Sequence, residues 1–204
     1  CQLGNLMAGV GLLIRSLESV PDQPEVHHNL GHALMKLGRA EEAVKSYDGA
    51  VRLRPAYVMA WFSRGNALMS LTRYDDAATS FERAVTTKPD FVEAWLERAN
   101  AQMAADQPAG ALACFDRVLT LQPGPREAML QRSGVLIVLE RFADALHSYD
   151  RLLERAPSQA VAWSNRGIAL MKTGRHAEAV ASYGRALELE PDRVDAWNNR
   201  GDAL

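Results

Sequence analysis

One stretch of the chain decides its fold: residues 58–91, which read VMAWFSRGNALMSLTRYDDAATSFERAVTTKPDF. Apolar residues recur in it every three or four positions, which predicts two amphipathic helices. We place the first helix at about 58–71 and the second at about 75–87, with Thr72, Arg73 and Tyr74 turning between them. Pro89 ends the second helix because proline lacks an N–H donor and clashes with the preceding turn. The stretch is therefore predicted to be a helical hairpin.

The hairpin recurs along the chain with a period of 34 residues, and such a period indicates a stack of structural repeats. An aromatic column holds Trp61, Trp95, Trp163 and Trp197, with His27 and Met129 at its two weaker positions. A small-residue column four positions later holds Gly31, Gly65, Ala99, Ser133, Gly167 and Gly201. Three further columns hold Ala43, Ala77, Ala111, Ala145 and Ala179; Tyr47, Phe81, Phe115, Tyr149 and Tyr183; and Pro21, Pro55, Pro89, Pro123, Pro157 and Pro191. The columns define full units at 24–57, 58–91, 92–125, 126–159 and 160–193, a partial unit at 194–204 and a loosely matching one at 1–23.

The small-residue column indicates that the two helices of each hairpin approach closely. Glycine inside a helix costs about 1 kcal/mol relative to alanine, so its repetition needs a packing reason. We expect larger side chains to clash at these positions and the aromatic columns to fill the space on either side. The fourth unit departs most, because Met129 replaces the aromatic residue and Ser133 is followed by Gly134.

The pattern W-x3-G, then A-x3-F/Y, then P, resembles the tetratricopeptide repeat, and the resemblance covers nearly the whole chain as one array, 1–204. It implies an all-α fold, a right-handed α-solenoid of antiparallel helix hairpins whose first helices line a concave groove. A lone hairpin cannot bury its apolar face, so neighbouring hairpins must stack. The resemblance also implies that the chain binds a partner protein or peptide in the groove and is not an enzyme.

Composition and charge exclude several other functions. Of 204 residues, 48% are apolar, and 23 Lys and Arg nearly balance 25 Asp and Glu, so no overall field attracts nucleic acid or an acidic membrane. The apolar stretch 6–14 is too short to span a bilayer. Cys1 and Cys114 have no metal-type or redox-type spacing, which fits a reducing compartment, and we place the chain in the cytoplasm. Because the pattern restarts before Leu204, we expect a fragment of a longer protein, with apolar ends that favour end-to-end self-association.

Candidate chemistry is sparse. His28 and His32 are four residues apart on a predicted helix, the spacing of two metal ligands, and His27 is adjacent. No third ligand is apparent, so we favour a polar patch and expect neither metal nor cofactor. Cys114 stands in a column otherwise held by serine, which indicates a need for a small residue more than a reactive thiol.

A column of arginines has two possible explanations. Arg64, Arg98, Arg132, Arg166 and Arg200 stand where the family more often has leucine. They could form a ladder for an anionic ligand. Alternatively, each could pair with the acidic column of Asp48, Glu82, Asp116 and Asp150, and we favour this structural role because the charges repeat in step.

Carried over from the family, the inner face of the first helices supplies the candidate binding residues. These are His28, His32, Phe62, Asn66, Met69, Leu96, Asn100, Met103, Leu130, Ile137 and Met171. Methionine suits a surface that accepts varied apolar partners, although filling gaps between helices explains this column equally well. Glu25, Glu93, Glu127 and Asp195 would make one edge acidic, so we expect a peptide with apolar anchors and some basic residues.

Two known binding modes of the family can be compared with the sequence. The carboxylate clamp that holds acidic chaperone tails needs Lys, Asn, Asn, Lys and Arg, but the corresponding positions hold Phe62, Asn66, Glu97, Glu127 and Gln131. Asn29, Asn165 and Asn199 match an asparagine ladder in O-linked N-acetylglucosamine transferases, although Ser63, Glu97 and Gln131 interrupt it. An alternative function is therefore the substrate-recognition arm of a larger glycosyltransferase.

Overall fold

The computed structural model describes residues 2–124 and 126–204, which form twelve helices and no strand. The helices are α1 (Gln2–Ser19), α2 (Pro24–Lys36), α3 (Ala40–Leu53), α4 (Val58–Ser70), α5 (Tyr74–Thr87), α6 (Val92–Ala104), α7 (Pro108–Leu121), α8 (Arg126–Val138), α9 (Phe142–Arg155), α10 (Ala160–Lys172), α11 (His176–Leu189) and α12 (Val194–Asp202). The even-numbered helices from α2 to α12 begin 34 residues apart. The predicted all-α class is confirmed, and the hairpin predicted from residues 58–91 is correct to within about one residue at each helix end.

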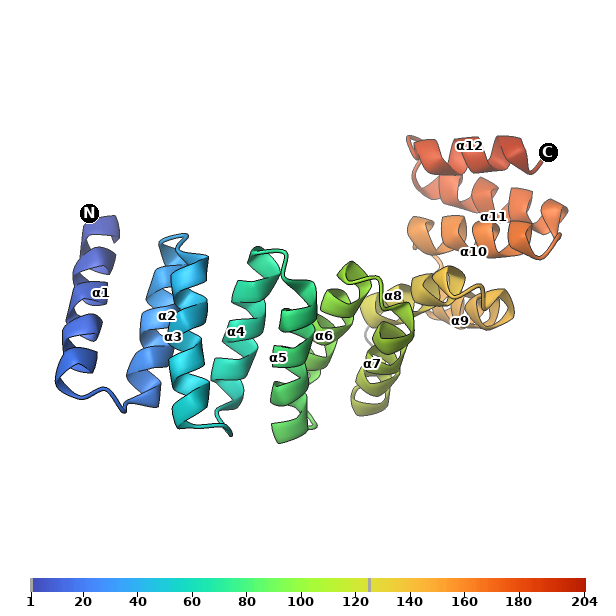
Figure 1. The fold of residues 1–204 in the computed structure, drawn as a ribbon. Helices are drawn as coiled ribbons and strands as arrows, with labels where there is room; N and C mark the ends of the chain where they lie inside the picture. Colours follow the sequence, from blue (N-terminus) through green and yellow to red (C-terminus); the bar gives the residue numbers. More distant parts are fainter. Residues whose placement is uncertain (1, 125) are drawn as a thin grey trace. The chain divides into compact units, whose positions relative to one another are not determined.

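The chain forms two compact units, which meet in sequence between Gln107 and Pro108. Unit 1 holds α1 to α6 and unit 2 holds α7 to α12 (Figure 1). Within each unit every helix packs against the next one along the chain. The first helices also contact one another, α2 with α4 and α4 with α6 in unit 1, and α8 with α10 and α10 with α12 in unit 2. The boundary between the units falls inside the predicted repeat 92–125, and the grouping of all repeats into one array stays a prediction.

The small-residue column does bring the paired helices together. A Cβ atom added to Gly65 would lie 2.5 Å from Cε1 of Phe81, and one added to Gly31 would lie 2.6 Å from Cε1 of Tyr47. Phe81 is 0% exposed and Tyr47 is 1% exposed, so neither ring has space to move away. In the hairpins that hold Gly31, Gly65 and Gly167, an aromatic ring thus lies directly on the backbone of the facing helix, as the glycine pattern predicted.

The turn inside each hairpin contains one residue in the left-handed conformation. Gly38 and Gly174 have φ angles of 72° and 74°, and Thr72, Asp106 and Glu140 occupy the same register with φ angles of 57°, 57° and 55°. A left-handed residue after the last helical turn lets the chain reverse, and glycine adopts it without strain. Three of the five turns therefore form at some conformational cost to a side chain.

Apolar side chains are exposed on α1 and α12, as expected for incomplete units. Met7 and Leu12 on α1 are 59% and 61% exposed, and Val194 and Trp197 on α12 are 69% and 54% exposed. Self-association through these surfaces stays a prediction. Cys1 lies outside the described residues. In the part of the chain that the structure describes, none of the helices combines the length and the hydrophobicity needed to cross a bilayer.

Candidate functional site

The arginine column ties consecutive helices together. Arg64 on α4 donates from Nε to Oδ1 of Asp48 on α3 at 2.6 Å, and from Nη1 to Oγ of Ser80 on α5 at 2.6 Å. Its guanidinium also lies over the ring of Trp61, with Cζ 5.9 Å from the ring centroid. One side chain on α4 therefore holds both the preceding and the following helix.

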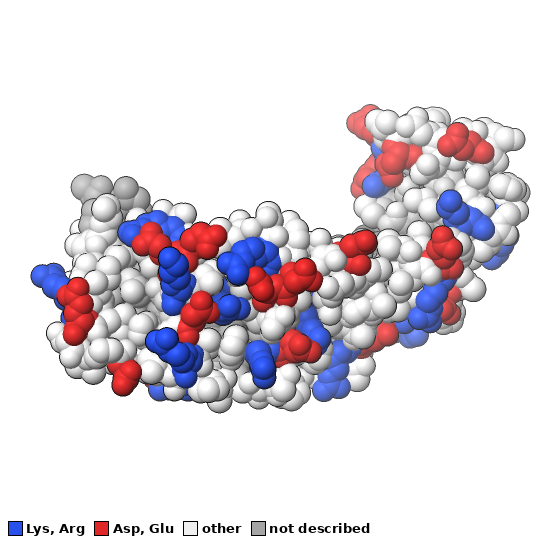
Figure 2. Space-filling model, in the orientation of Figure 1, with Lys and Arg blue, Asp and Glu red and all other residues white. Residues whose placement is uncertain are grey.

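The same arrangement recurs in the other repeats. Arg166 contacts Asp150 at 2.7 Å and Ser182 at 2.8 Å, and Arg132 contacts Asp116 at 2.5 Å and Ser148 at 2.8 Å. Arg98 pairs with Glu82 at 2.8 Å through Nη2. The structural pairing that we favoured from the sequence is confirmed for these arginines, which are not aligned along an open surface. Figure 2 shows acidic and basic side chains interleaved on the visible face of unit 1.

Arg200 is an exception to the predicted pairing. The acidic position sixteen residues earlier in the other repeats is Gly184, which has no carboxylate. Within residues 2–124 and 126–204, Arg200 makes no ion pair, and its buried Nε has no hydrogen-bond partner. Its remaining contact is with the ring of Trp197, whose centroid is 6.0 Å from Cζ. The predicted pairing therefore does not extend to this position, because the acidic column ends at Asp150.

The candidate binding residues of unit 1 lie on α2, α4 and α6, and we refer to them as the unit 1 face: His28, His32, Phe62, Asn66, Met69, Leu96, Asn100 and Met103. On α4 and on α6 they follow the spacing i, i+4, i+7, which places them on one side of each helix. His32, Asn66 and Asn100 are exposed, and the other members are partly buried. The structure thus brings these residues together on adjacent first helices. Their role in binding stays a prediction.

Two members of the unit 1 face are also packing residues. The ring of Phe62 lies between Phe81 of the same hairpin and Phe91 before the next one, at centroid distances of 5.7 and 5.0 Å. His28 lies in the same way between Tyr47 and Tyr57, at 5.6 and 5.1 Å. The sequence analysis missed Tyr57 and Phe91. Their 34-residue separation was a signal that could have revealed a further aromatic column.

His28 is partly buried and contacts the neighbouring repeat. Its Nε2 lies 3.2 Å from Oγ of Ser63, in hydrogen-bond contact. Burial lowers the pKa of His28 below its usual 6.5, and the nearby positive charge of His32 lowers it further. Among the described residues, no group of three or more His, Cys, Asp or Glu is arranged to hold a metal ion.

In unit 2 the candidate residues are Leu130 and Ile137 on α8 and Met171 on α10, all partly buried. The equivalent of Phe62 on α10 is Ser164, which is 0% exposed and donates to Oδ2 of Asp195 at 3.1 Å. The unit 2 residues are therefore fewer and less exposed than the unit 1 face, and no polar side chain like Asn66 stands among them. Their role in binding also stays a prediction.

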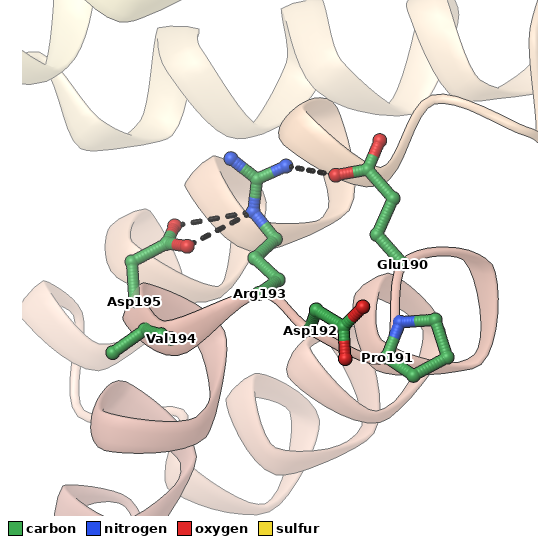
Figure 3. A pocket seen from close by; sticks show the side chains of 6 residues that line it. All are labelled: Glu190, Pro191, Asp192, Arg193, Val194 and Asp195. Carbon is green, nitrogen blue, oxygen red and sulfur yellow. Dashed lines mark hydrogen bonds and ion pairs between the residues drawn. The ribbon is translucent and has the colours of Figure 1, made fainter.

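The predicted acidic edge is partly neutralised. Glu25 pairs with Arg54 at 2.5 Å. Arg193 lies between Glu190 and Asp195 and donates to both carboxylates (Figure 3). Burial alone would raise the pKa of Asp195, but the hydrogen bonds from Arg193 and Ser164 outweigh it and the pKa is lowered. A cavity of about 490 Å³ beside this turn is lined by residues 190–195, and its arginine is paired with two of its carboxylates.

Models of known protein families match this sequence. A tetratricopeptide-repeat model matches residues 2–58, 28–91, 62–128 and 96–160, and a second one matches residues 160–193. The chain belongs to the tetratricopeptide-repeat family. No curated protein sequence matches this tetratricopeptide-repeat chain significantly.

Solved structures share the fold at low sequence identity. YrrB, described as a tetratricopeptide-repeat protein with an unusual peptide-binding site, superposes with a TM-score of 0.81 at 21% identity, covering 93% of this chain and 97% of YrrB. MamA has a TM-score of 0.76 at 20% identity, covering 83% of this chain and 93% of MamA. A chain of the Naa15/Naa10 assembly bound to HypK-THB has a TM-score of 0.74 at 18% identity, covering 98% of this chain and 31% of that one. These likenesses show a shared fold, and the family match supports a protein-interaction scaffold.

Proposed function

We propose that the unit 1 face binds an extended or helical peptide segment of a partner protein. The observation that carries the proposal is the exposure of Asn66 and Asn100 at equivalent positions of α4 and α6, next to residues that are completely buried. Ala67 and Leu68, which follow Asn66, are 0% exposed, as is Ala101. Hairpin packing therefore uses the neighbouring positions and leaves the asparagines available to a ligand.

The chemistry of the unit 1 face fits a peptide. An asparagine side chain both donates and accepts hydrogen bonds, so a pair of them on adjacent helices can satisfy a peptide backbone. Met69, Met103 and Leu96 lie beside the asparagines and offer apolar surface that adapts to different side chains. Glu93, at the edge of α6, would attract a basic residue of the peptide. YrrB, which shares the fold, is described as having a peptide-binding site, and this adds to the proposal.

Phe62 is not a suitable position at which to test binding. Replacing Phe62 removes its contacts with Phe81 and Phe91, so loss of binding would be mixed with loss of stability. The suitable variant carries arginine at both exposed asparagines, Asn66→Arg with Asn100→Arg. This pair of substitutions adds bulk and positive charge where a peptide with basic residues would lie, without disturbing a packed side chain.

The experiment is selection of random displayed peptides on the wild-type chain, followed by anisotropy titration of the selected peptides. We expect apolar anchors with nearby basic residues to be enriched, and Asn66→Arg with Asn100→Arg to weaken binding by about tenfold or more, which is 1.4 kcal/mol per factor of ten. Thr79→Arg with Thr86→Arg on α5 is the matched control, since both threonines are exposed on a second helix. If the control pair weakens binding as much as the asparagine pair, the unit 1 face is not the binding site.

A further inference from the structure

The tryptophan of the aromatic column has the same two polar contacts wherever it occurs. The indole Nε1 donates to a proline carbonyl six residues earlier, at 2.8 Å from Trp61, 3.0 Å from Trp95, 2.8 Å from Trp163 and 2.9 Å from Trp197. The guanidinium of the arginine three residues later lies over the ring, at 5.7 to 6.0 Å from its centroid. The surroundings of this position are thus built to receive an indole.

The fourth repeat keeps these surroundings but has no indole. Met129 occupies the tryptophan position, and a methionine has neither the N–H donor nor the ring area of tryptophan. A cavity of about 380 Å³ lies at this place in unit 2, within the range of small-molecule sites. Its lining includes Met129, the equivalent proline Pro123, and Leu119 on α7.

The arginine that would stack on the ring is still in position. Arg132 lines the cavity and is held by Asp116 at 2.5 Å and by Ser148 at 2.8 Å. Its guanidinium therefore remains oriented without the tryptophan that accompanies it in the other repeats. A planar cation fixed by two neighbouring helices is a preorganised surface for an aromatic ring.

Positive charge at the cavity specifies a second part of the ligand. Arg151 and Arg155 on α9 also line it, and no ion pair involves either of them among the residues that the structure describes. With Arg132 they make three arginines against the single carboxylate of Asp116, which Arg132 already occupies. Arg155 is particular to this repeat, because the same position holds Leu53, Thr87, Leu121 and Leu189 in the others. Arginines of this kind favour a carboxylate.

We propose that this cavity binds an indole ring carried beside a carboxylate. The ring would take the place of the missing tryptophan, with its face on Arg132 and its N–H directed to the carbonyl of Pro123. The carboxylate would lie against Arg151 and Arg155. Two sources offer this chemistry: a free N-acyl tryptophan, or the C-terminal tryptophan of a polypeptide. The site is separate from the unit 1 face and does not depend on the function proposed for it.

The first test is calorimetric titration of the chain with N-acetyltryptophan, with its carboxamide, and with short peptides that end in tryptophan. We expect saturable binding of the carboxylate form below about 1 mM. The carboxamide should bind about fivefold more weakly, since a partly exposed charge pair has a modest effect. If N-acetyltryptophan and the peptides both bind, the site accepts either source of the ligand. If only the peptides bind, the ligand is the C-terminus of a polypeptide. Absence of saturable binding to every carboxylate form would overturn the proposal.

Substitutions then locate the site. Met129→Trp should abolish binding and raise the melting temperature by about 2–6 °C, because a tryptophan of the chain would fill the cavity. Arg155→Leu should weaken the carboxylate form about fivefold while leaving the carboxamide unchanged. Arg117→Leu on α7 is the matched control, since Arg117 is exposed and does not line the cavity. If Met129→Trp binds like the wild type, or fails to raise the melting temperature, the cavity is not an indole site.

Discussion

The second repeat and the fourth repeat use the same arginine contacts but different packing. In the second, Trp61 donates to Pro55 and Phe81 lies directly on Gly65. In the fourth, Met129 leaves a cavity, and α8 and α9 contact each other less extensively than α4 and α5 do. Ser133 stands at the position of Gly65, and its Oγ donates to the carbonyl of Met129 at 2.7 Å.

The difference separates two sets of contacts that stabilise the second repeat. The first set, made by Trp61 and Gly65, determines how closely the helices approach, whereas the second, made by Arg64, links α4 to the helices before and after it. The fourth repeat lacks the first set of contacts and has the second, since Arg132 donates hydrogen bonds to both Asp116 and Ser148. A repeat can therefore depart from the family pattern in its packing and remain joined to its neighbour.

The largest effect is expected from giving the second repeat the residue of the fourth. Trp61→Met removes ring area, the hydrogen bond to Pro55 and the stacking surface for Arg64, so unfolding should become easier by about 2–4 kcal/mol. Chemical denaturation followed by circular dichroism would measure the loss. An unchanged midpoint would mean that the tryptophan column does not stabilise the packing.

A smaller loss is expected from Gly65→Ser, which copies the small-residue position of the fourth repeat. The added Cβ would lie 2.5 Å from the fully buried ring of Phe81, and overpacking of this kind costs about 1–3 kcal/mol. Gly201→Ser is the control, since a Cβ there meets nothing within 4 Å. Equal melting temperatures for the two variants would contradict the close-approach explanation.

The arginine contacts can be compared between the same two repeats. Arg64→Met and Arg132→Met each remove hydrogen bonds to one acid and one serine, but only the first also removes a contact with tryptophan. We expect Arg64→Met to be the more destabilising by about 0.5–1 kcal/mol, the usual contribution of an exposed cation–π contact. Urea midpoints of the two variants would test this order, and a reversed order would show that the ring contributes nothing.

The smallest effect is expected for the pH dependence of the stability, in a comparison of the first repeat with the second. His28 occupies the position of Phe62, and its pKa in the folded chain is lowered from 6.5, chiefly by burial. The unfolded chain therefore binds the proton more readily, and stability falls as the pH drops through about 6.5 towards the lower folded value. His28→Phe should remove this loss, so its melting temperature should exceed that of the wild type more at about pH 5 than at about pH 8. If the difference in melting temperature is the same at both pH values, protonation of His28 does not destabilise the folded chain.

The period of the sequence was enough to predict the hairpins and several of their contacts. Gly65 implied a close approach because glycine is otherwise unfavourable in a helix, and the structure places Phe81 there. Arg64 was predicted to pair with Asp48 because their two columns share the 34-residue period, and Nε of Arg64 lies 2.6 Å from Oδ1 of Asp48. Such contacts are predictable because repetition displays the same constraint several times.

Other features depend on distances that no pattern reveals. Phe62 and Asn66 are both predicted binding residues on one side of α4, yet Phe62 lies between two rings while Asn66 is exposed. The sequence also marked Met129 as a deviation without indicating whether the neighbours would close around it. The cavity shows that they do not, because the surrounding helices are held by Arg132 and its partners.

The arginine contacts have a consequence for the order in which the array comes apart. In a linear array, cooperativity depends on how strongly each repeat is coupled to its neighbours relative to its own stability. Arg64 and Arg166 strengthen the coupling, so partly unfolded states with a single lost hairpin should be sparsely populated around them. At Arg200 this coupling lacks its acid because Gly184 supplies none. Within unit 2, amide exchange should therefore be fastest in α12, and unfolding from that helix should meet its first strong resistance at α10.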